Sequence, residues 1–220
     1  MKYAFIFLFL FTTFLATGQD VINDPNAQPR SVGAFTKVDV SNAFDIYLVQ
    51  GNESALAVSA SNDEYRDKIK TYVQNGTLHI KLEADKSFWN SLKNNKMNLK
   101  AYISIKSLEE LEVSGACNVN LVNDISADKL KIRLSGASDL KGKINANFLN
   151  VNLSGASDVR LSGVVENLNV SVSGASDFKG YDLAANYCVA DASGASSVQL
   201  TVNKELNAKA SGASDIKKRS

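Results

Sequence analysis

Three aspartates recur at one position of a repeated motif, and carboxylates in such an arrangement are candidate metal ligands. Asp139, Asp158 and Asp177 each follow a Ser-Gly-Ala-Ser tetrapeptide directly, at intervals of 19 residues. If the repeats stack as strands, these side chains lie about 4.8 Å apart. One interpretation is structural, with each Asp accepting hydrogen bonds from backbone N–H groups at a solvated corner. The alternative is a Ca²⁺ site, because Ca²⁺ prefers oxygen ligands. The glycine-rich nonapeptide of calcium-binding β-rolls does not occur in the chain.

Other residues with catalytic potential are few. His79 is the only histidine, and the alternation in LHIKL places it between two inward residues, facing solvent. The sequence contains no nucleophile elbow, no metal-spaced His/Cys cluster and no phosphate-binding loop. It therefore indicates no catalytic residue and no cofactor.

Two features are candidates for contact with a glycan. Phe88 and Trp89 form an aromatic pair within a polar stretch. Their rings suit stacking on a sugar, or alternatively they hold a loop against the core. A polar ladder, facing either a polysaccharide or water, is predicted at Asn150, Asn152, Asn169 and Ser171.

The elements that position these residues come from the tetrapeptide repeat. Its six copies begin at Ser114, Ser135, Ser154, Ser173, Ser193 and Ser211, with steps of 21, 19, 19, 20 and 18 residues. The residues before each copy alternate between apolar and polar, as in LKIRL and LNVNL, which predicts strands with one buried face. A unit of this length cannot bury its apolar face alone, whereas stacked units can. The pattern predicts one coil of a parallel β-helix or β-roll per repeat.

The tetrapeptide itself is predicted to be the corner of each coil. Glycine tolerates the backbone angles of a sharp turn, and the candidate corner glycines are Gly115, Gly136, Gly155, Gly174, Gly194 and Gly212. Counting by twos from Leu153 places Gly155, Ser157 and Val159 on the inner side. The serines then form an internal hydroxyl ladder, in which Cys117 takes the serine position of the first copy. Cys117 and Cys188 lie in different columns about three repeats apart, roughly 14 Å, so both are predicted to be free and buried.

Residues 35–110 lack the tetrapeptide and are predicted to form irregular first coils that close one end of the solenoid. The segment 35–51 reads as two strands, and SALAVSAS as another. A short helix is expected in NDEYRDKIK, with Asn62 or Asp63 as its cap. Asn75-Gly76, between alternating apolar runs, predicts a β-hairpin.

The ends of the chain and its net charge indicate where the protein is located and which partners are excluded. Residues 1–18 have the basic start, apolar run and small-residue end of a signal peptide, so we expect export to the periplasm, the cell surface or the medium. No membrane span is expected after cleavage. Residues 19–34 are predicted to be a flexible leader, 35–216 a single solenoid domain with repeats over 111–216, and 217–220 a basic tail. A net charge of +1 argues against nucleic acid as a partner.

The combination of FTKVDVSNAFDIYLVQG, YVQNGTLHIKL and serial SGAS copies resembles a known family. It is similar to the putative auto-transporter adhesin, head GIN domain family, over about residues 35–216. The resemblance implies a right-handed parallel β-helix in an exported protein of Bacteroidetes-type bacteria. It implies no established activity, ligand or catalytic residue.

The sequence thus favours an all-β, non-enzymatic, exported solenoid with a structural or adhesive role, whose partner is a glycan or a surface protein. The alternatives are a carbohydrate-active β-helix enzyme similar to polysaccharide lyases, or a Ca²⁺-dependent glycan-binding protein. The last repeat shrinks to small residues and leaves a strand edge open, so a homo-oligomer is expected.

Overall fold

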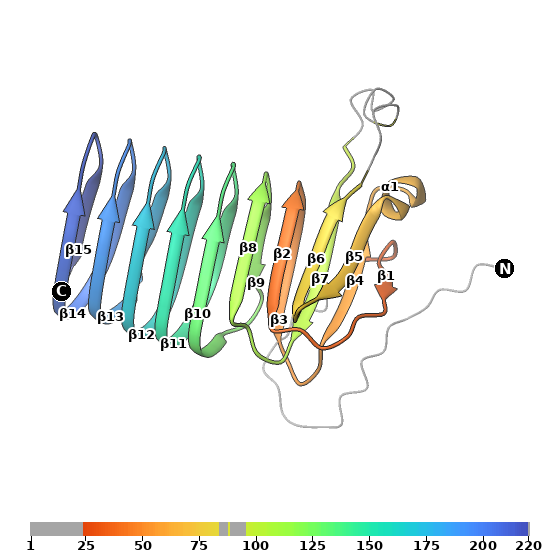
Figure 1. Ribbon diagram of the computed structural model, residues 1–220, viewed down its shortest axis with the longest axis horizontal. Helices are drawn as coiled ribbons and strands as arrows, with labels where there is room; N and C mark the ends of the chain where they lie inside the picture. Colours follow the sequence, from red (N-terminus) through yellow and green to blue (C-terminus); the bar gives the residue numbers. More distant parts are fainter. Residues whose placement is uncertain (1–23, 84–87, 89–95, 220) are drawn as a thin grey trace.

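The computed structural model describes residues 24–83, 88 and 96–219 of this chain. They form a β-solenoid of about 6 turns, in which 68% of the residues are in strands and 3% in helix. Successive coils stack side by side along one axis (Figure 1). The expected all-β parallel solenoid is confirmed, including its period, since Asp139 pairs with Asp158 and Leu153 with Val172.

The solenoid has two walls that meet at the corners, and we name them by chain direction. The entry wall holds the strands that lead into the corners and the N-terminal strands that pair beside them. In spatial order these are β5 (Ile69–Gln74), β6 (Thr77–Leu82), β2 (Lys37–Asn42), β8 (Glu110–Gly115) and β10 (Ile125–Leu134). It continues through the C-terminal parts of β11 (Asp139–Leu153), β12 (Asp158–Val172), β13 (Asp177–Ala192) and β14 (Ser197–Ala210).

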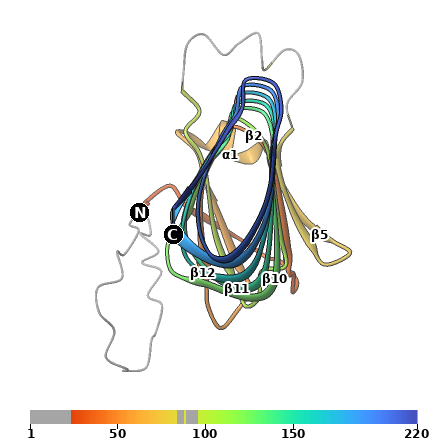
Figure 2. The same cartoon turned by 90° about the vertical axis from the view of Figure 1, so that its left-hand side faces the viewer.

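The exit wall holds the strands that leave the corners and the N-terminal strands that pair beside them. In order these are β1 (Gln28–Arg30), β4 (Ala55–Ser59), β7 (Leu99–Ile105), β3 (Phe44–Gln50) and β9 (Asn118–Leu121). The first residues of β11 to β14 continue it, and β15 (Asp215–Arg219) pairs with β14. Seen along the axis, the walls converge on a narrow edge formed by the corners and diverge towards a broad base (Figure 2).

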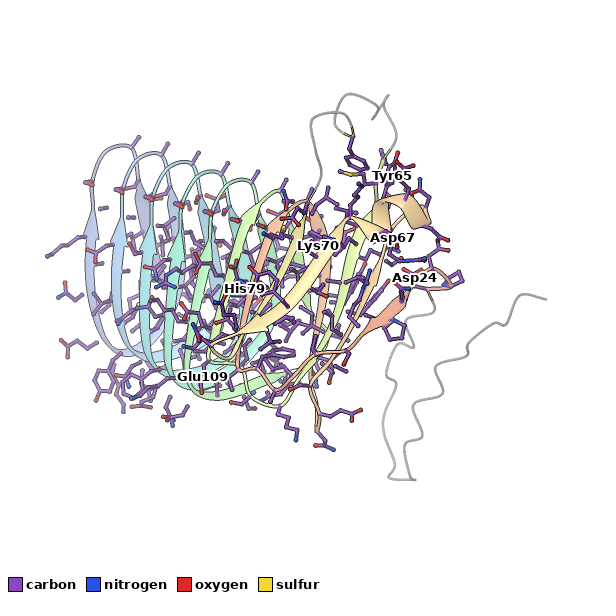
Figure 3. All side chains as sticks on the ribbon, turned by 45° about the vertical axis from the view of Figure 1, so that its right-hand side comes forward. Asp24, Tyr65, Asp67, Lys70, His79 and Glu109 are labelled. Atoms are coloured by element: carbon purple, nitrogen blue, oxygen red, sulfur yellow. The ribbon has the colours of Figure 1, made fainter. Side chains whose placement is uncertain are left out.

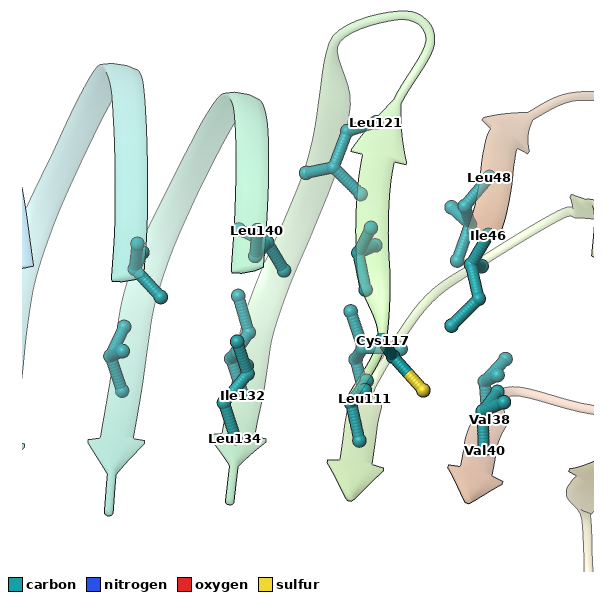
Figure 4. Close-up of a cluster of buried hydrophobic side chains, with 14 of the residues drawn as sticks. Val38, Val40, Ile46, Leu48, Leu111, Cys117, Leu121, Ile132, Leu134 and Leu140 are labelled. Carbon is teal, nitrogen blue, oxygen red and sulfur yellow. The ribbon is translucent and has the colours of Figure 1, made fainter. Parts of the chain in front are cut away.

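The core fills the space between the walls, because alternate residues of each strand point inward. Leu111, Ile132 and Leu134 from the entry wall face Leu121 and Leu140 from the exit wall, and all are at most 6% exposed (Figure 4). Cys117 and Cys188 are both buried and free, as predicted. The core is less well covered at the last coil. Ala208 and Ala210 occupy positions that face inward in the earlier coils, but both are exposed.

The coils do not follow one another in chain order at the N-terminal end. β2 pairs in parallel with both β6 and β8, and β3 pairs with both β7 and β9. The coil made of β2 and β3 is therefore inserted between two coils that come later in the sequence. The chain leaves it, builds the end of the solenoid, and returns past it.

The predicted local elements of the N-terminal half are present. Helix α1 (Asp63–Asp67) begins after Asn62, whose side chain accepts a hydrogen bond from the Tyr65 backbone N–H. β5 and β6 form the predicted antiparallel hairpin, with positive φ at Asn75 and Gly76. β4 is the expected strand, but it pairs antiparallel with β7, and β1 pairs antiparallel with β4.

Two predicted boundaries are wrong. Residues 28–30 of the expected flexible leader form β1, which pairs with β4 because its backbone groups find a free strand edge there. Lys217 to Arg219 of the expected tail belong to β15 and pair with β14. The predicted signal peptide and residues 19–23 of the leader lie outside the residues that the structure describes.

Candidate functional site

The corners hold the inner serines in place through hydrogen bonds within and between coils. The Ser157 hydroxyl donates to the Ser154 carbonyl oxygen at 3.1 Å, and the Ser157 N–H donates to the Ser176 hydroxyl at 3.1 Å. Ser138, Ser157, Ser176 and Ser196 are all buried. Cys117 takes the same position in the first copy, with its thiol 3.5 Å from the Ser114 carbonyl oxygen. The predicted internal ladder is confirmed.

The corner glycines all have a positive φ, from +72° at Gly212 to +96° at Gly115, although Gly155 does not face inward. Gly155 is exposed, because its φ of +80° turns the chain outward and interrupts the alternation until Ser157. A Cβ added there would lie 2.3 Å from the carbonyl oxygen of Gly136 in the preceding coil. The corners are linked by backbone hydrogen bonds, such as that from the Ala156 N–H to the Gly136 oxygen at 2.7 Å.

The aspartates after the corners form one outward column on the exit wall. Asp139 pairs in register with Asp158, and Asp158 with Asp177. Lys179 forms ion pairs with both Asp158 and Asp177. This ammonium group relieves the repulsion between the two carboxylates. No group of three or more His, Cys, Asp or Glu side chains within 24–83, 88 and 96–219 is arranged to hold a metal ion.

The same column extends into a coil that the repeat analysis missed. Asn118 pairs in register with Asp139 on one side and with Asp45 on the other. The Asn118 side-chain amide donates to the Asp45 carboxylate at 2.8 Å. The segment Ser41–Asp45 is a degenerate corner, with Asn42 paired to Gly115 and a φ of +91°. The signal was present in the sequence, since VSNAFDI matches VSGACNV in length and polarity, with Asn replacing the glycine.

A second outward column runs beside the aspartates and carries longer side chains. In spatial order it consists of Tyr102, Tyr47, Asn120, Lys141, Arg160 and Lys179. The two tyrosine rings are stacked, with centroids 5.2 Å apart and planes 18° apart. Asn120 is much shorter than its neighbours on either side. A shallow groove of about 380 Å³ follows from this difference in length, lined among others by Tyr47, Asn118, Asn120, Lys141 and Arg160.

The tyrosine stack is anchored at the N-terminal end of the solenoid. The Tyr102 hydroxyl donates to the Asp24 carboxylate at 2.7 Å, and Lys100 lies 3.3 Å from the same carboxylate. Burial alone would raise the pKa of Asp24, but hydrogen bonds from Tyr102, Asn26 and Ser59, together with the charge of Lys100, lower it. Burial and the Asp24 contact raise the pKa of Tyr102. Asp24 lies beside β1, at the end opposite β15 (Figure 3).

The other sequence candidates lie away from this groove. Phe88 is 5% exposed and packs edge-on against Tyr65 at 5.5 Å, which favours the alternative that this ring holds a loop against the core over stacking on a sugar. An apolar contact under α1 outweighs the polar context of the sequence. Trp89 lies outside the described residues. His79 is on the outer side of the entry wall, paired with Asp39 at 2.9 Å and stacked on Tyr72 (Figure 3).

The predicted polar ladder on the entry wall is present in register. Asn150 pairs with Asn169, and Asn152 with Ser171. The Asn152 amide donates to the Asn150 side-chain oxygen at 2.5 Å. Two side chains of this ladder therefore already form a hydrogen bond with each other. Whether it meets a glycan stays a prediction.

The fold and the corner repeat agree with comparisons to known proteins. A family model described as putative auto-transporter adhesin, head GIN domain, matches residues 34–219. The chain belongs to this family. No curated protein matches the sequence.

Solved structures of low sequence identity share the fold. A putative adhesin from Bacteroides fragilis has 20% identity and a TM-score of 0.71, over 88% of this chain and 96% of that one. A putative adhesin from Parabacteroides merdae has 13% identity and a TM-score of 0.61, over 88% and 95%. A putative lipid binding protein from Parabacteroides distasonis has 17% identity and a TM-score of 0.57, over 88% and 96%. Within the described part of this head GIN domain protein, no helix has the length and apolar character to cross a membrane.

Proposed function

We propose that this head GIN domain protein is a non-enzymatic, exported adhesive module that binds a surface glycan through the exit wall. The observation that carries the proposal is the pair of outward columns on that wall. Side chains that form hydrogen bonds recur there at every coil, in register, from Asp45 to Asp177 and from Tyr47 to Lys179. A ligand built of repeating units, with many hydroxyl groups, matches a surface that itself repeats.

The rigidity of the solenoid supports this role. Each corner is bonded to the next through backbone hydrogen bonds of 2.6–2.8 Å, such as Ala116 to Asn42 and Ala175 to Gly155. A preorganised surface loses little conformational entropy on binding, so weak contacts repeated over several coils add up to adhesion.

The proposal is tested by applying the exported protein to an array of immobilised neutral and acidic glycans. We expect retention on at least one glycan class, and unchanged retention after addition of EDTA. Retention that EDTA abolishes would favour the Ca²⁺-dependent alternative through the Asp139 column.

The enzymatic alternative is tested on the same ligands in solution. A polysaccharide lyase releases unsaturated sugars, which are detected by their ultraviolet absorbance. We expect no turnover of acidic polysaccharides. Turnover that is lost in Asp158→Asn would overturn the adhesive proposal.

A further inference from the structure

The groove on the exit wall lies at the level where a third ring would continue the stack of Tyr102 and Tyr47. Neighbouring strands lie about 4.8 Å apart, so each coil contributes one level to the outward column. Tyr102 and Tyr47 occupy two successive levels with their rings nearly parallel. The next level belongs to β9, where the short Asn120 leaves the far face of the Tyr47 ring uncovered in this column. A six-membered sugar ring that presents its C–H face to Tyr47 can take this third level of the stack.

The next two levels of the column carry two adjacent positive charges. Lys141 and Arg160 are paired in register on β11 and β12, and both are exposed. Among the described residues neither forms an ion pair, whereas Lys179 one level further is paired with Asp158 and Asp177. Like charges opposite each other on neighbouring strands are destabilising. An anionic group bound between them would remove this repulsion.

Besides the buried Ile46, Val119 and Leu140, the groove is lined by further polar groups on its corner side. Asn118 already donates to Asp45, and Asp158 is neutralised by Lys179. Asp139 is exposed and borders the groove beside Asn118. Its carboxylate accepts hydrogen bonds, which suits the hydroxyl groups of a sugar and disfavours a second anion on that side.

We propose that the β9 level of the exit wall binds an acidic pyranose, a hexuronate unit of a polysaccharide, between Tyr47 and the pair Lys141 and Arg160. The sugar ring stacks on Tyr47, its carboxylate contacts the two cations, and its hydroxyl groups meet Asn118, Asn120 and Asp139. This inference rests on the proposed function, because it names the class of glycan that the exit wall binds.

The test measures binding of oligogalacturonate to the exported protein by calorimetry at low salt, alongside the same oligosaccharide with methyl-esterified carboxyl groups. The double variant Lys141→Gln, Arg160→Gln should weaken binding by at least about tenfold, since hydrogen bonds to charged groups are lost. Asn120→Tyr should abolish binding, because the new ring fills the level meant for the sugar. Tyr47→Ala should weaken it as well.

Matched controls separate site effects from changes in charge or folding. Lys37→Gln with Lys70→Gln removes the same charge from the entry wall and should leave binding unchanged. Melting curves must show each variant folded. Polyglutamate, an acidic polymer without a pyranose ring, should bind at least about tenfold more weakly than oligogalacturonate.

The outcomes distinguish the two proposals. Equal binding of the acid and its ester, or equal binding of polyglutamate, would overturn the acidic-pyranose site. If groove variants have no effect while a glycan still binds, the inference fails and the adhesive function stands. If neither the neutral nor the acidic glycans bind the unaltered protein, both proposals are wrong.

Discussion

The stacked corners make a quantitative prediction about Gly155. With a side chain at this position, Cβ would lie 2.3 Å from the Gly136 carbonyl oxygen and 3.0 Å from the Gly136 nitrogen. Both atoms are backbone, so neither yields by a rotamer change. In Gly155→Ala the left-handed φ costs roughly 1–2 kcal/mol, and forcing the coils apart costs roughly 1–3 kcal/mol. Weakening the Ala156 to Gly136 hydrogen bond adds about 1 kcal/mol.

The free energy of unfolding should therefore fall by roughly 3–6 kcal/mol. For a domain of this size each kcal/mol lowers Tm by roughly 2–4 °C. We expect Gly155→Ala to melt at least about 6 °C below the unaltered protein, as followed by far-ultraviolet circular dichroism.

Two other glycines separate backbone strain from contact between coils. Gly76 has a similar φ of +74°, but a Cβ there meets nothing within 4 Å. At Gly212 the nearest atom, the Gly194 oxygen, is 2.8 Å away. The loss of stability should rise from Gly76→Ala through Gly212→Ala to Gly155→Ala. Equal shifts in Tm for all three would refute the argument that the coils meet at these glycines.

Three further predictions concern the cysteines, the N-terminal anchor and the last strand. Burial raises the pKa of Cys188 to about 12, so we expect no alkylation of its thiol at pH 8 until denaturant is added, as read by mass spectrometry. Because the pKa of Asp24 is lowered in the folded state, its contribution to stability is fully present above the ordinary pKa of 3.8 and is lost as the pH falls through the lowered pKa of the folded state. Asp24→Asn should therefore lower Tm at pH 7 and make much less difference at pH 3. Finally, we expect a homo-oligomer by light scattering, with a mass that neutralising Lys217, Lys218 and Arg219 does not change. A monomer that associates only after this neutralisation would contradict that expectation.

The sequence predicts the repeating part of the fold well, because each feature there is local. Alternation identifies the strands, and the tetrapeptide identifies the corners. The presence of Cys117 in a serine position also indicates correctly which corner residue is buried. These signals depend on neighbours in the chain or on a constant period. The misplacement of Gly155 arises where a positive φ interrupts the period of two.

The candidate site is predicted only in part, because it depends on which strands become neighbours. Asp139, Asp158 and Asp177 share a period and are placed together correctly. Tyr47 and Tyr102 stand 55 positions apart in the sequence with no shared motif, and only the pairing of β3 with β7 stacks them. The sequence does not reveal the antiparallel pairing of β1 and β4 either. Inward and outward residues alternate in the same way in parallel and antiparallel strands.

The inserted coil links the architecture to the groove. β3 carries Tyr47 and β9 carries Asn120, and the two pair although residues 51–117 separate them in the chain. Between them in the chain, β4 and β7 belong to the coil that supplies Tyr102 on the other side of Tyr47. The aromatic side of the groove thus comes from the pairing of β3 with β7, and the return of the chain through β9 places Asn120 beside it. Its cationic side comes from the regular repeats of β11 and β12. The groove therefore lies where the irregular end meets the regular repeats, and a solenoid made of uniform repeats would place identical side chains at every level and leave no gap for a ring.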